Sequence, residues 1–181
     1  RRLLFGIDFE FLAHHHPLTR LPNRRALNRN LTAAVKKARI EGIFCAILYI
    51  DLDNFKKIND TYGHRCGDVV IKALANTLRN RLRETDMIGR YGGEEFVMIL
   101  PDTDRDDALA VVERLRQRIR AARVESEGLV LALTVSAGVT GHRVDESVTP
   151  DQLLVEADEA LYYAKESGRD RACVYGDWGQ S

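Results

Sequence analysis

A pair of adjacent glycines, Gly92 and Gly93, separates two strand-like apolar runs, residues 87–88 and 96–100. Two glycines between such runs predict a β-hairpin, because glycine adopts positive φ without steric cost. The missing Cβ at both positions also lets a ligand approach the backbone closely. This hairpin limits the fold to one in which neighbouring strands run antiparallel at this point.

Acids occur at the ends of two predicted strands. Glu94 and Glu95 follow the glycines, and the apolar run 43–50 ends abruptly at Asp51. An acid at the end of a buried strand lies at the rim of a sheet, where ligands tend to bind. Acids from two neighbouring strand ends make an oxygen site of the kind that Mg²⁺ shares with substrate phosphates. The hairpin alone favours acids that are merely solvated, so the choice between solvated acids and a metal site depends on other motifs of the chain.

Helical and strand-like segments alternate along the chain, with the hairpin as the one interruption. This order suggests an antiparallel or mixed sheet with helices on one face. A polar loop is expected over residues 141–148. Helices are predicted over residues 23–41 (capped by Asn23 and ended by Gly42), 55–61, 70–83, 106–123 and from 149 or 151 to 168, and strands over 43–50, 129–139 and 172–175.

Residues 1–15 are unusually apolar, and Leu4, Ile7 and Phe11 have heptad spacing. Two interpretations stay open: a helix that continues from an upstream sensor, or a helix packed on its own domain. No Met precedes Arg1, so an upstream part is expected. The run His14–His16 invites a metal site, but adjacent side chains cannot all face one ion, which disfavours it.

The composition bounds the class of protein. A chain of 181 residues forms one ordinary domain with a sizeable core. The 27 basic and 27 acidic residues balance, so bulk charge does not favour nucleic acid. Runs long enough to cross a bilayer and signal peptides are not found. Three widely spaced cysteines argue against a disulfide framework or a zinc site and fit the reducing cytoplasm.

Several separated motifs together resemble the GGDEF family of diguanylate cyclases. They are the stretch Asp51–Asp60, the steps at residues 63–64 and 67–68, and Arg90–Phe96, where the signature has its GGEEF form. The similarity extends from Leu18 to Arg171, nearly the whole chain. It implies an upstream linker or helix at 1–16, the catalytic domain at 17–176 and a tail at 177–181.

The resemblance also implies the fold, an α/β (α+β) domain with a ferredoxin-like βαββαβ palm core as in nucleotidyl cyclases. Its central sheet is mostly antiparallel and flanked by helices. One position departs from the family pattern, because His16 stands where an Asp usually helps to hold the turn into the domain.

The activity that the resemblance implies is the joining of two GTP molecules into cyclic di-GMP with release of two pyrophosphates. Such a transfer needs positioning and charge neutralisation. Mg²⁺, with Mn²⁺ as an alternative, would be held by Asp51, Glu94 and the backbone carbonyl of Leu52, and Glu95 either joins them or takes the hydroxyl proton. Lys56 is the fourth catalytic residue. Each domain holds one GTP, so an active homodimer is expected.

The same resemblance names the residues that bind GTP. Asn59 and Asp68 would read guanine, and Lys56, Lys165 and Arg169 would contact the phosphates, beside Gly92 and Gly93. The amides at Asn54 and Phe55 could cradle a phosphate at a helix start. Local alternatives are a helix N-cap for Asp68, following Gly67, and dipole-stabilising charges at a helix end for Lys165 and Arg169.

An RxxD motif, Arg83 to Asp86, matches the family's inhibitory site for cyclic di-GMP, which Arg114 or a neighbour would complete. The alternative is an i,i+3 salt bridge at a helix end. Two other functions stay open: a silent domain of this family that binds nucleotide and signals to a partner, and a cyclase with another base preference, against which Asp68 argues.

Overall fold

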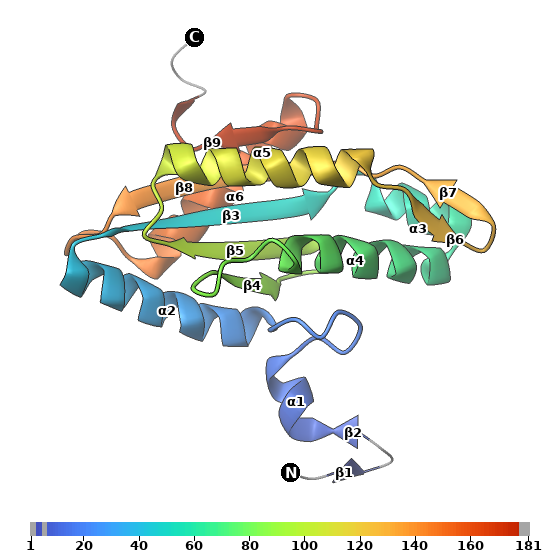
Figure 1. Ribbon diagram of the computed structural model, residues 1–181, viewed down its shortest axis with the longest axis horizontal. Helices are drawn as coiled ribbons and strands as arrows, with labels where there is room; N and C mark the ends of the chain where they lie inside the picture. Colours follow the sequence, from blue (N-terminus) through green and yellow to red (C-terminus); the bar gives the residue numbers. More distant parts are fainter. Residues whose placement is uncertain (1–2, 5–6, 178–181) are drawn as a thin grey trace.

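The computed structural model describes residues 3–4 and 7–177, and a five-stranded sheet forms its centre (Figure 1). Four strands are antiparallel neighbours, and only the last edge strand runs parallel to its neighbour. The predicted α/β fold with a mostly antiparallel sheet is therefore confirmed. Across the sheet, the strands are β4 (Met87–Arg90), β5 (Glu95–Pro101), β3 (Phe44–Leu52), β8 (Val135–Arg143) and β9 (Ala172–Val174).

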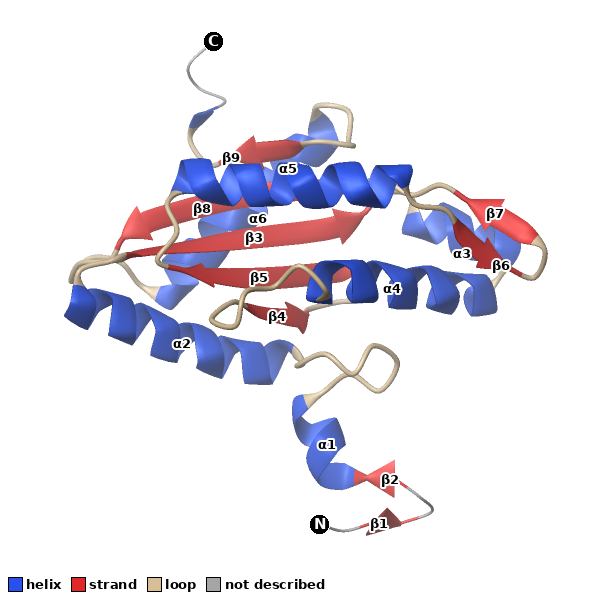
Figure 2. Ribbon diagram, viewed as in Figure 1, coloured by secondary structure: helices blue, strands red, loops and turns tan. Residues whose placement is uncertain are grey.

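Helices cover both faces of this sheet (Figure 2). Alternate residues of β3 point to opposite cores: Ile47 packs with α2 (Arg24–Glu41) and α6 (Pro150–Glu166), whereas Leu48 packs with α4 (His64–Arg79) and α5 (Arg105–Ala121). The prediction of helices on one face is wrong. An unbroken apolar run such as that in β3 is typical of a strand buried from both sides.

Two predicted boundaries near the site are also wrong. The expected strand 129–139 is interrupted: β7 (Leu129–Leu131) pairs with β6 (Val124–Ser126) in a separate hairpin, and β8 starts at Val135. β8 then continues into the expected polar loop, because its Arg143 still pairs with Phe44 of β3. The break falls where Thr134 turns to bind Asp53, a contact that local sequence does not reveal.

The helices next to the site have well-defined ends. α2 begins as predicted, with the Asn23 side chain accepting a hydrogen bond from Ala26 N at 3.0 Å, and it ends at Gly42, where φ is +65°. α3 (Phe55–Tyr62) follows β3 directly. α4 ends at Arg79 rather than near residue 83, so Arg83 lies in the turns before β4.

The position of α6 depends on one glycine of β8. A Cβ added to Gly138 would lie 2.0 Å from the Ala157 carbonyl oxygen and 2.3 Å from Leu161 N. The helix backbone therefore rests directly on the strand backbone, which only glycine permits. This contact sets where the last turn of α6, with Lys165, meets the end of β3.

The N-terminal segment differs from the expected helix. β1 (Leu3–Leu4) and β2 (Ile7–Asp8) form a two-stranded pair, and α1 (Phe9–His14) begins only afterwards. The heptad expectation is therefore wrong, because two of its three members lie in strands. Residues 1–2 and most of the predicted tail, 178–181, lie outside the described part of the chain. Within that part, no helix is both long and apolar enough for a bilayer crossing.

Candidate active site

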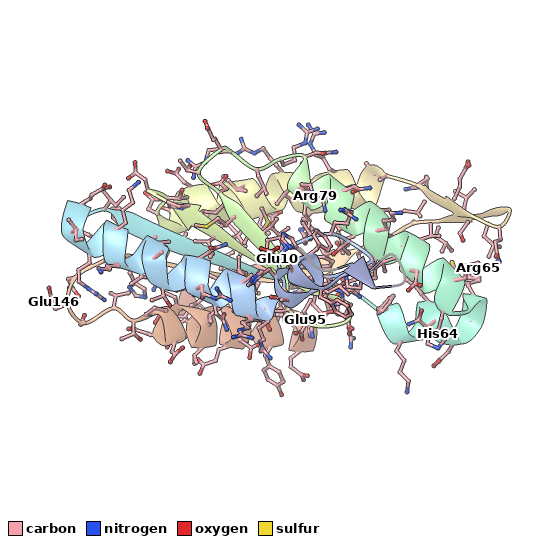
Figure 3. All side chains as sticks on the ribbon, turned by 90° about the horizontal axis from the view of Figure 1, so that it is seen from below. Glu10, His64, Arg65, Arg79, Glu95 and Glu146 are labelled. Carbon is pink, nitrogen blue, oxygen red and sulfur yellow. The ribbon has the colours of Figure 1, made fainter. Side chains whose placement is uncertain are left out.

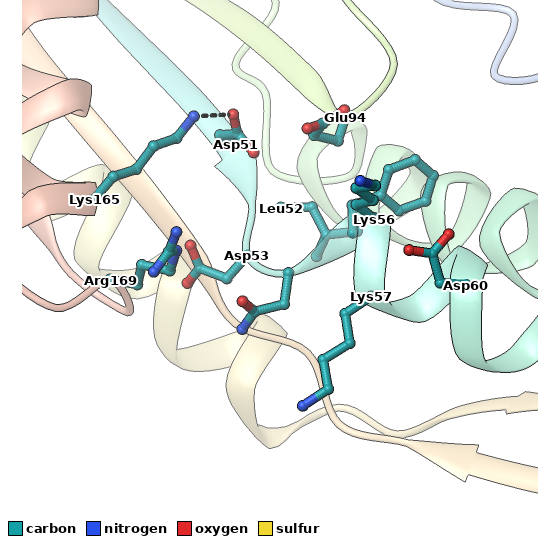
Figure 4. Close-up of a pocket in the computed structure, with 11 residues that line it drawn as sticks. Asp51, Leu52, Asp53, Lys56, Lys57, Asp60, Glu94, Lys165 and Arg169 are labelled. Atoms are coloured by element: carbon teal, nitrogen blue, oxygen red, sulfur yellow. Dashed lines mark hydrogen bonds and ion pairs between the residues drawn. The ribbon is translucent and has the colours of Figure 1, made fainter.

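The acids from two strand ends meet as predicted. Asp51, near the end of β3, is the register partner of Glu95 at the start of β5, and Leu52 N donates to the Glu94 carbonyl oxygen at 3.1 Å. Asp51 is 4% exposed. Lys165 reaches it from α6, with its Nζ 2.5 Å from Asp51 Oδ2 (Figure 4).

A pocket of about 440 Å³ opens beside these acids (Figure 4). It brings together residues from the end of β3, the start of α3, the loop before β5 and the end of α6. Its lining residues are Asp51, Leu52, Asp53, Asn54, Phe55, Lys56, Lys57, Asp60, Glu94, Lys165 and Arg169. Acids at one side and lysine and arginine side chains around them suit a metal-bound polyphosphate.

The electrostatics of Asp51 indicate a site that needs a cation. Burial raises the pKa of Asp51 to about 6, Lys165 opposes this shift by hydrogen bonding and charge, and Glu94 and Glu95 raise the pKa further. Negative charge is therefore concentrated here in excess of what one lysine neutralises. A divalent cation would relieve this repulsion.

The donor set fits Mg²⁺ bound together with substrate. The chain offers the carboxylates of Asp51 and Glu94 and the Leu52 carbonyl, all hard oxygens. In the described part of the chain, no three His, Cys, Asp or Glu side chains are arranged to hold a metal by themselves. Mg²⁺ commonly completes such a partial set with phosphate oxygens and water.

Asp53 is a residue of the pocket to which the sequence analysis gave no role. Its carboxylate accepts from Ser136 Oγ at 2.6 Å, from Thr134 Oγ1 at 2.8 Å and from Asp170 N at 3.0 Å. Asp53 thus joins the end of β3 to β8 and to the loop that carries Arg169. The sequence shows Asp53 at the acidic end of a predicted strand, but its hydrogen-bond partners lie more than 80 residues further along the chain.

The phosphate side of the pocket contains the start of α3. Asn54 has φ +58°, which Asn tolerates better than most residues, and its side chain does not cap the helix. The first amides of α3 are therefore not satisfied by that side chain, and such amides attract anions. Lys56, Lys165 and Arg169 line the same pocket as expected, with Arg169 just beyond the end of α6.

The two residues predicted to read guanine, Asn59 and Asp68, do not line this pocket. α4 begins at His64 with Gly63 as N-cap, so the N-cap alternative for Asp68 is wrong. Asp68 is exposed in the second turn. Asn59 Oδ1 is buried without a hydrogen-bond partner in the described structure, against Gly67, where an added Cβ would lie 1.8 Å away.

The predicted hairpin is confirmed, because the glycine loop, residues 91–94, connects the antiparallel strands β4 and β5, but its glycines are not at the expected positive φ. The loop is held by Arg90 instead, whose Nε lies 3.2 Å from both the Gly92 and Gly93 carbonyl oxygens and whose Nη2 lies 2.7 Å from the latter. A Cβ on Gly93 would meet nothing within 4 Å, so this backbone is open to a ligand.

Glu95 is held close to the pocket but does not line it. Its Oε2 accepts a hydrogen bond from the Tyr49 hydroxyl at 3.1 Å. The charge of Glu95 raises the pKa of Asp51, which places it within electrostatic reach of the candidate metal ligands.

A second cavity, of about 310 Å³, contains the predicted inhibitory residues. Arg83 Nη2 lies 2.8 Å from Asp86 Oδ1, and the same nitrogen donates to the Pro101 carbonyl oxygen and to Thr103. The i,i+3 salt bridge of the alternative interpretation is thus present, but it lies in a loop and not at a helix end. The lining residues are Arg81, Arg83, Asp86, Val111, Arg114, Leu115 and Arg118.

The three consecutive histidines have separate partners, which agrees with the argument against a shared metal. His14 Nδ1 lies 3.4 Å from Arg29, and His15 stacks on the Phe11 ring. His16 Nδ1 lies 3.1 Å from Arg90 Nη1.

Comparison with known proteins agrees with this geometry. The model of the family described as "Diguanylate cyclase, GGDEF domain" matches residues 13–171. The chain is 44% identical over 155 residues to diguanylate cyclase DgcP of Pseudomonas aeruginosa, covering 86% of this chain and 23% of the relative. It is 44% identical over 161 residues to response regulator PleD of Caulobacter vibrioides, covering 88% of this chain and 35% of the relative.

Solved structures give the same result. The GGDEF domain of DgcB from Caulobacter crescentus, in complex with c-di-GMP, superposes with a TM-score of 0.88 at 30% identity, over 98% of this chain and 99% of that domain. The chain thus spans about a quarter to a third of the two curated relatives and nearly all of this isolated domain. The chain therefore belongs to the GGDEF family of diguanylate cyclase domains.

Proposed function

We propose that this chain is an active, Mg²⁺-dependent diguanylate cyclase that condenses two GTP molecules into cyclic di-GMP. The observation that carries the proposal is one pocket in which Asp51 and Glu94 lie beside Lys165, Arg169 and the uncapped start of α3. Carboxylates for a metal and cations for a triphosphate are both present, as a nucleotidyl transfer requires.

One group of residues is assigned to the metal and another to the phosphates. Asp51, Glu94 and the Leu52 carbonyl would hold Mg²⁺, for which Mn²⁺ could substitute, while Lys56, Lys165 and Arg169 would hold the phosphates. When bound, the ion would supply Lewis-acid chemistry for the attacking hydroxyl and charge neutralisation for the leaving pyrophosphate. Lys165, which pairs with Asp51 at 2.5 Å, exchanges this carboxylate for a phosphate when metal and nucleotide bind.

The reaction requires two domains. The 3′-oxygen of one GTP bonds to the α-phosphorus of the other, the bond from that phosphorus to the α,β-bridging oxygen breaks, and the hydroxyl proton passes to Glu95 or to water. The two nucleotides then exchange roles: the second 3′-oxygen attacks the remaining α-phosphorus in the same way, which closes the ring and releases the second pyrophosphate. Each domain is proposed to hold one GTP, so the stoichiometry of two GTP per product calls for two domains that face each other in a homodimer.

Guanine is selected by Asn59 and Asp68. A carboxylate accepts from guanine N1–H and N2–H₂, whereas adenine presents an acceptor at N1. The Asn59 carbonyl, which is buried without a partner in the described structure, is suited to accept a third base N–H once the amide turns from Gly67.

The second cavity is proposed to bind the product. Arg83 and Asp86 present a fork of donors beside an acceptor, with Arg114 from α5 on the same cavity wall. Guanidinium groups bind phosphates and the guanine O6/N7 edge. Cyclic di-GMP bound here inhibits without occupying the GTP pocket.

The test compares two glutamates. Purified protein is incubated with GTP and Mg²⁺, and cyclic di-GMP is quantified for the wild type, Glu94→Gln and Glu146→Gln. Glu146 is an exposed acid at one end of the molecule, whereas Glu95 lies near its middle (Figure 3), and Glu146 serves as a matched control. Activity is expected to persist in Glu146→Gln and to fall below detection in Glu94→Gln, since the latter loses a metal-binding charge but little volume.

A wild-type protein that binds GTP yet forms no product at any Mg²⁺ concentration would instead favour the binding-only function. Product formation by Glu94→Gln at saturating Mg²⁺ would contradict the assigned metal ligand.

A further inference from the structure

The segment that precedes α2 is joined to the glycine loop through one side chain, Arg90. His16 lies in the turn before α2, and its Nδ1 is 3.1 Å from Arg90 Nη1. The other edge of the same guanidinium binds the carbonyl oxygens of Gly92 and Gly93, the closer at 2.7 Å. Arg90 is only 8% exposed, so its guanidinium bonds to these protein groups rather than mainly to solvent.

The turn that carries His16 is fixed in place. His16 N donates to the Leu21 carbonyl oxygen at 2.8 Å, and Arg20 N donates to the His16 carbonyl oxygen at 2.8 Å. Arg79 of α4 donates to the Thr19 carbonyl within the turn, and Arg90 N donates to the Pro22 carbonyl oxygen at 2.9 Å. The backbone that carries the imidazole is therefore held by contacts other than the hydrogen bond between His16 and the Arg90 side chain.

The hydrogen bond requires a neutral imidazole. Arginine remains protonated in proteins and only donates, so His16 Nδ1 must be the acceptor. A protonated imidazole has no acceptor and adds a second positive charge at this distance. Burial lowers the pKa of His16, and the charge of Arg90 lowers it further, so the neutral form is the stable one at neutral pH.

The charges around this pair lie on several elements. Arg90, on β4, is the charged group that acts on His16. Arg90 itself is influenced by Asp68 of α4 and by Glu94 of the glycine loop, both assigned to the nucleotide site. Arg79 of α4 binds the same turn, while the neighbouring His14 and His15 contact Arg29 and Phe11. A positive charge on His16 would therefore repel Arg90, whose charge also interacts with Asp68 and Glu94.

We propose that neutral His16 is a positioning residue for the nucleotide site. It holds Arg90 on the carbonyl oxygens of Gly92 and Gly93, and its protonation loosens the glycine loop. The proposal rests on the proposed function for its effect on turnover. In this proposal, nucleotide binding also depends on the turn that precedes α2, through the titratable contact between His16 and Arg90.

The test uses three variants of the whole chain. His16→Asn retains an acceptor at the δ position that does not titrate, and His16→Ala removes the acceptor. His15→Asn is the matched control, because the neighbouring ring contacts Phe11 and not Arg90. Binding of a non-reactive GTP analogue and cyclic di-GMP formation are measured from pH 8 to pH 5.5. Asp51 titrates in the same range in every variant, so only differences between variants are interpreted.

The wild type and His15→Asn are expected to lose roughly tenfold more analogue affinity on acidification than His16→Asn, about the value of one hydrogen bond to a charged group. His16→Ala is expected to be weak at all pH values. Parallel pH profiles for the wild type and His16→Asn would overturn the proposal.

An NMR titration of the histidine rings keeps this test separate from the cyclase activity. The His16 signal, assigned by its absence from the His16→Asn spectrum, should titrate below the ordinary histidine value of 6.5. A His16 pKa at or above that ordinary value would overturn the proposal even if the protein makes cyclic di-GMP. A low His16 pKa, together with a larger loss of analogue affinity on acidification in the wild type than in His16→Asn, would support it even if turnover is absent.

Discussion

At the scale of single residues, the site depends on a buried acid whose charge is disfavoured by burial and by two neighbouring acids and favoured by one lysine. Asp51 is nearly inaccessible, lies near two other acids and has one lysine partner, and its pKa rises to about 6. A metal-binding acid of this kind is costly to the apo fold, because the desolvated charge is stable only when a cation is near.

The first prediction concerns stability without metal. The folded pKa of Asp51, about 6, lies above its ordinary value of 3.8, so the folded state binds the proton more tightly. The free energy of unfolding should therefore fall as pH rises from 4 through 6, by up to about 3 kcal/mol at about 1.4 kcal/mol per pKa unit. Asp51→Asn should lack this decline. Urea unfolding in EDTA across this range measures it, and parallel curves for both proteins would refute the assignment.

Base selection is a second property of single residues. Asp68→Asn replaces an acceptor of two N–H groups by one acceptor and one donor, so one hydrogen bond to a charged group is lost. The kcat/KM for GTP should fall roughly 10- to 100-fold relative to that for ATP. Rates with both nucleotides under the same conditions provide the measurement, and an unchanged GTP/ATP ratio would place base recognition elsewhere.

At the scale of elements, the site exists because helices and strands are locked at specific backbone contacts. α6 rests on Gly138 of β8, and Asp53 ties the end of β3 to β8 and to the loop of Arg169. These contacts decide where Lys165 and Arg169 lie relative to Asp51.

Gly138→Ala tests this packing. The added Cβ would lie 2.0 Å from the Ala157 carbonyl, and a backbone group cannot rotate away as a side chain can. A loss of about 3 kcal/mol or more is expected, the upper end for overpacked cores. Gly141→Ala on the same strand, where the nearest atom is the Ala46 Cβ at 3.2 Å, should lose about 1 kcal/mol. Equal losses by urea unfolding would show that the α6 contact is not special.

The sequence predicted elements whose determinants are local. The bounds of α2 followed from Asn23 and Gly42, and the approach of Asp51 to Glu94 followed from two motifs. It missed what long-range contacts decide: the break before Val135, which Thr134 makes by binding Asp53, and the glycine loop, which Arg90 holds without positive φ. The roles of the site residues came from the resemblance and remain predictions.

At the scale of the whole molecule, the two candidate sites lie at opposite ends of one strand. β5 starts at Glu95, beside the acidic pocket, and ends at Pro101, whose carbonyl accepts from Arg83 in the second cavity at 3.0 Å. Product bound at the second cavity would therefore not fill the GTP pocket of the same domain. We therefore expect inhibition by this route to act through the arrangement of two domains.

Arg83→Ala should consequently relieve product inhibition and leave initial rates nearly unchanged. Arg83 also neutralises the nearly buried Asp86, so Arg114→Ala is a second variant that leaves this ion pair intact. Initial rates measured against added cyclic di-GMP should show inhibition constants raised at least about tenfold in both, the loss expected for one bidentate arginine contact. Inhibition curves identical to the wild type in both variants would exclude the site.

The most direct test of the central claim is the mass balance of the reaction. The purified chain is given GTP and Mg²⁺, and nucleotides and pyrophosphate are separated and quantified over time. The account predicts cyclic di-GMP with two pyrophosphates per product molecule and no orthophosphate. GTP that is bound but unchanged, or that is hydrolysed to GDP and orthophosphate, would contradict it.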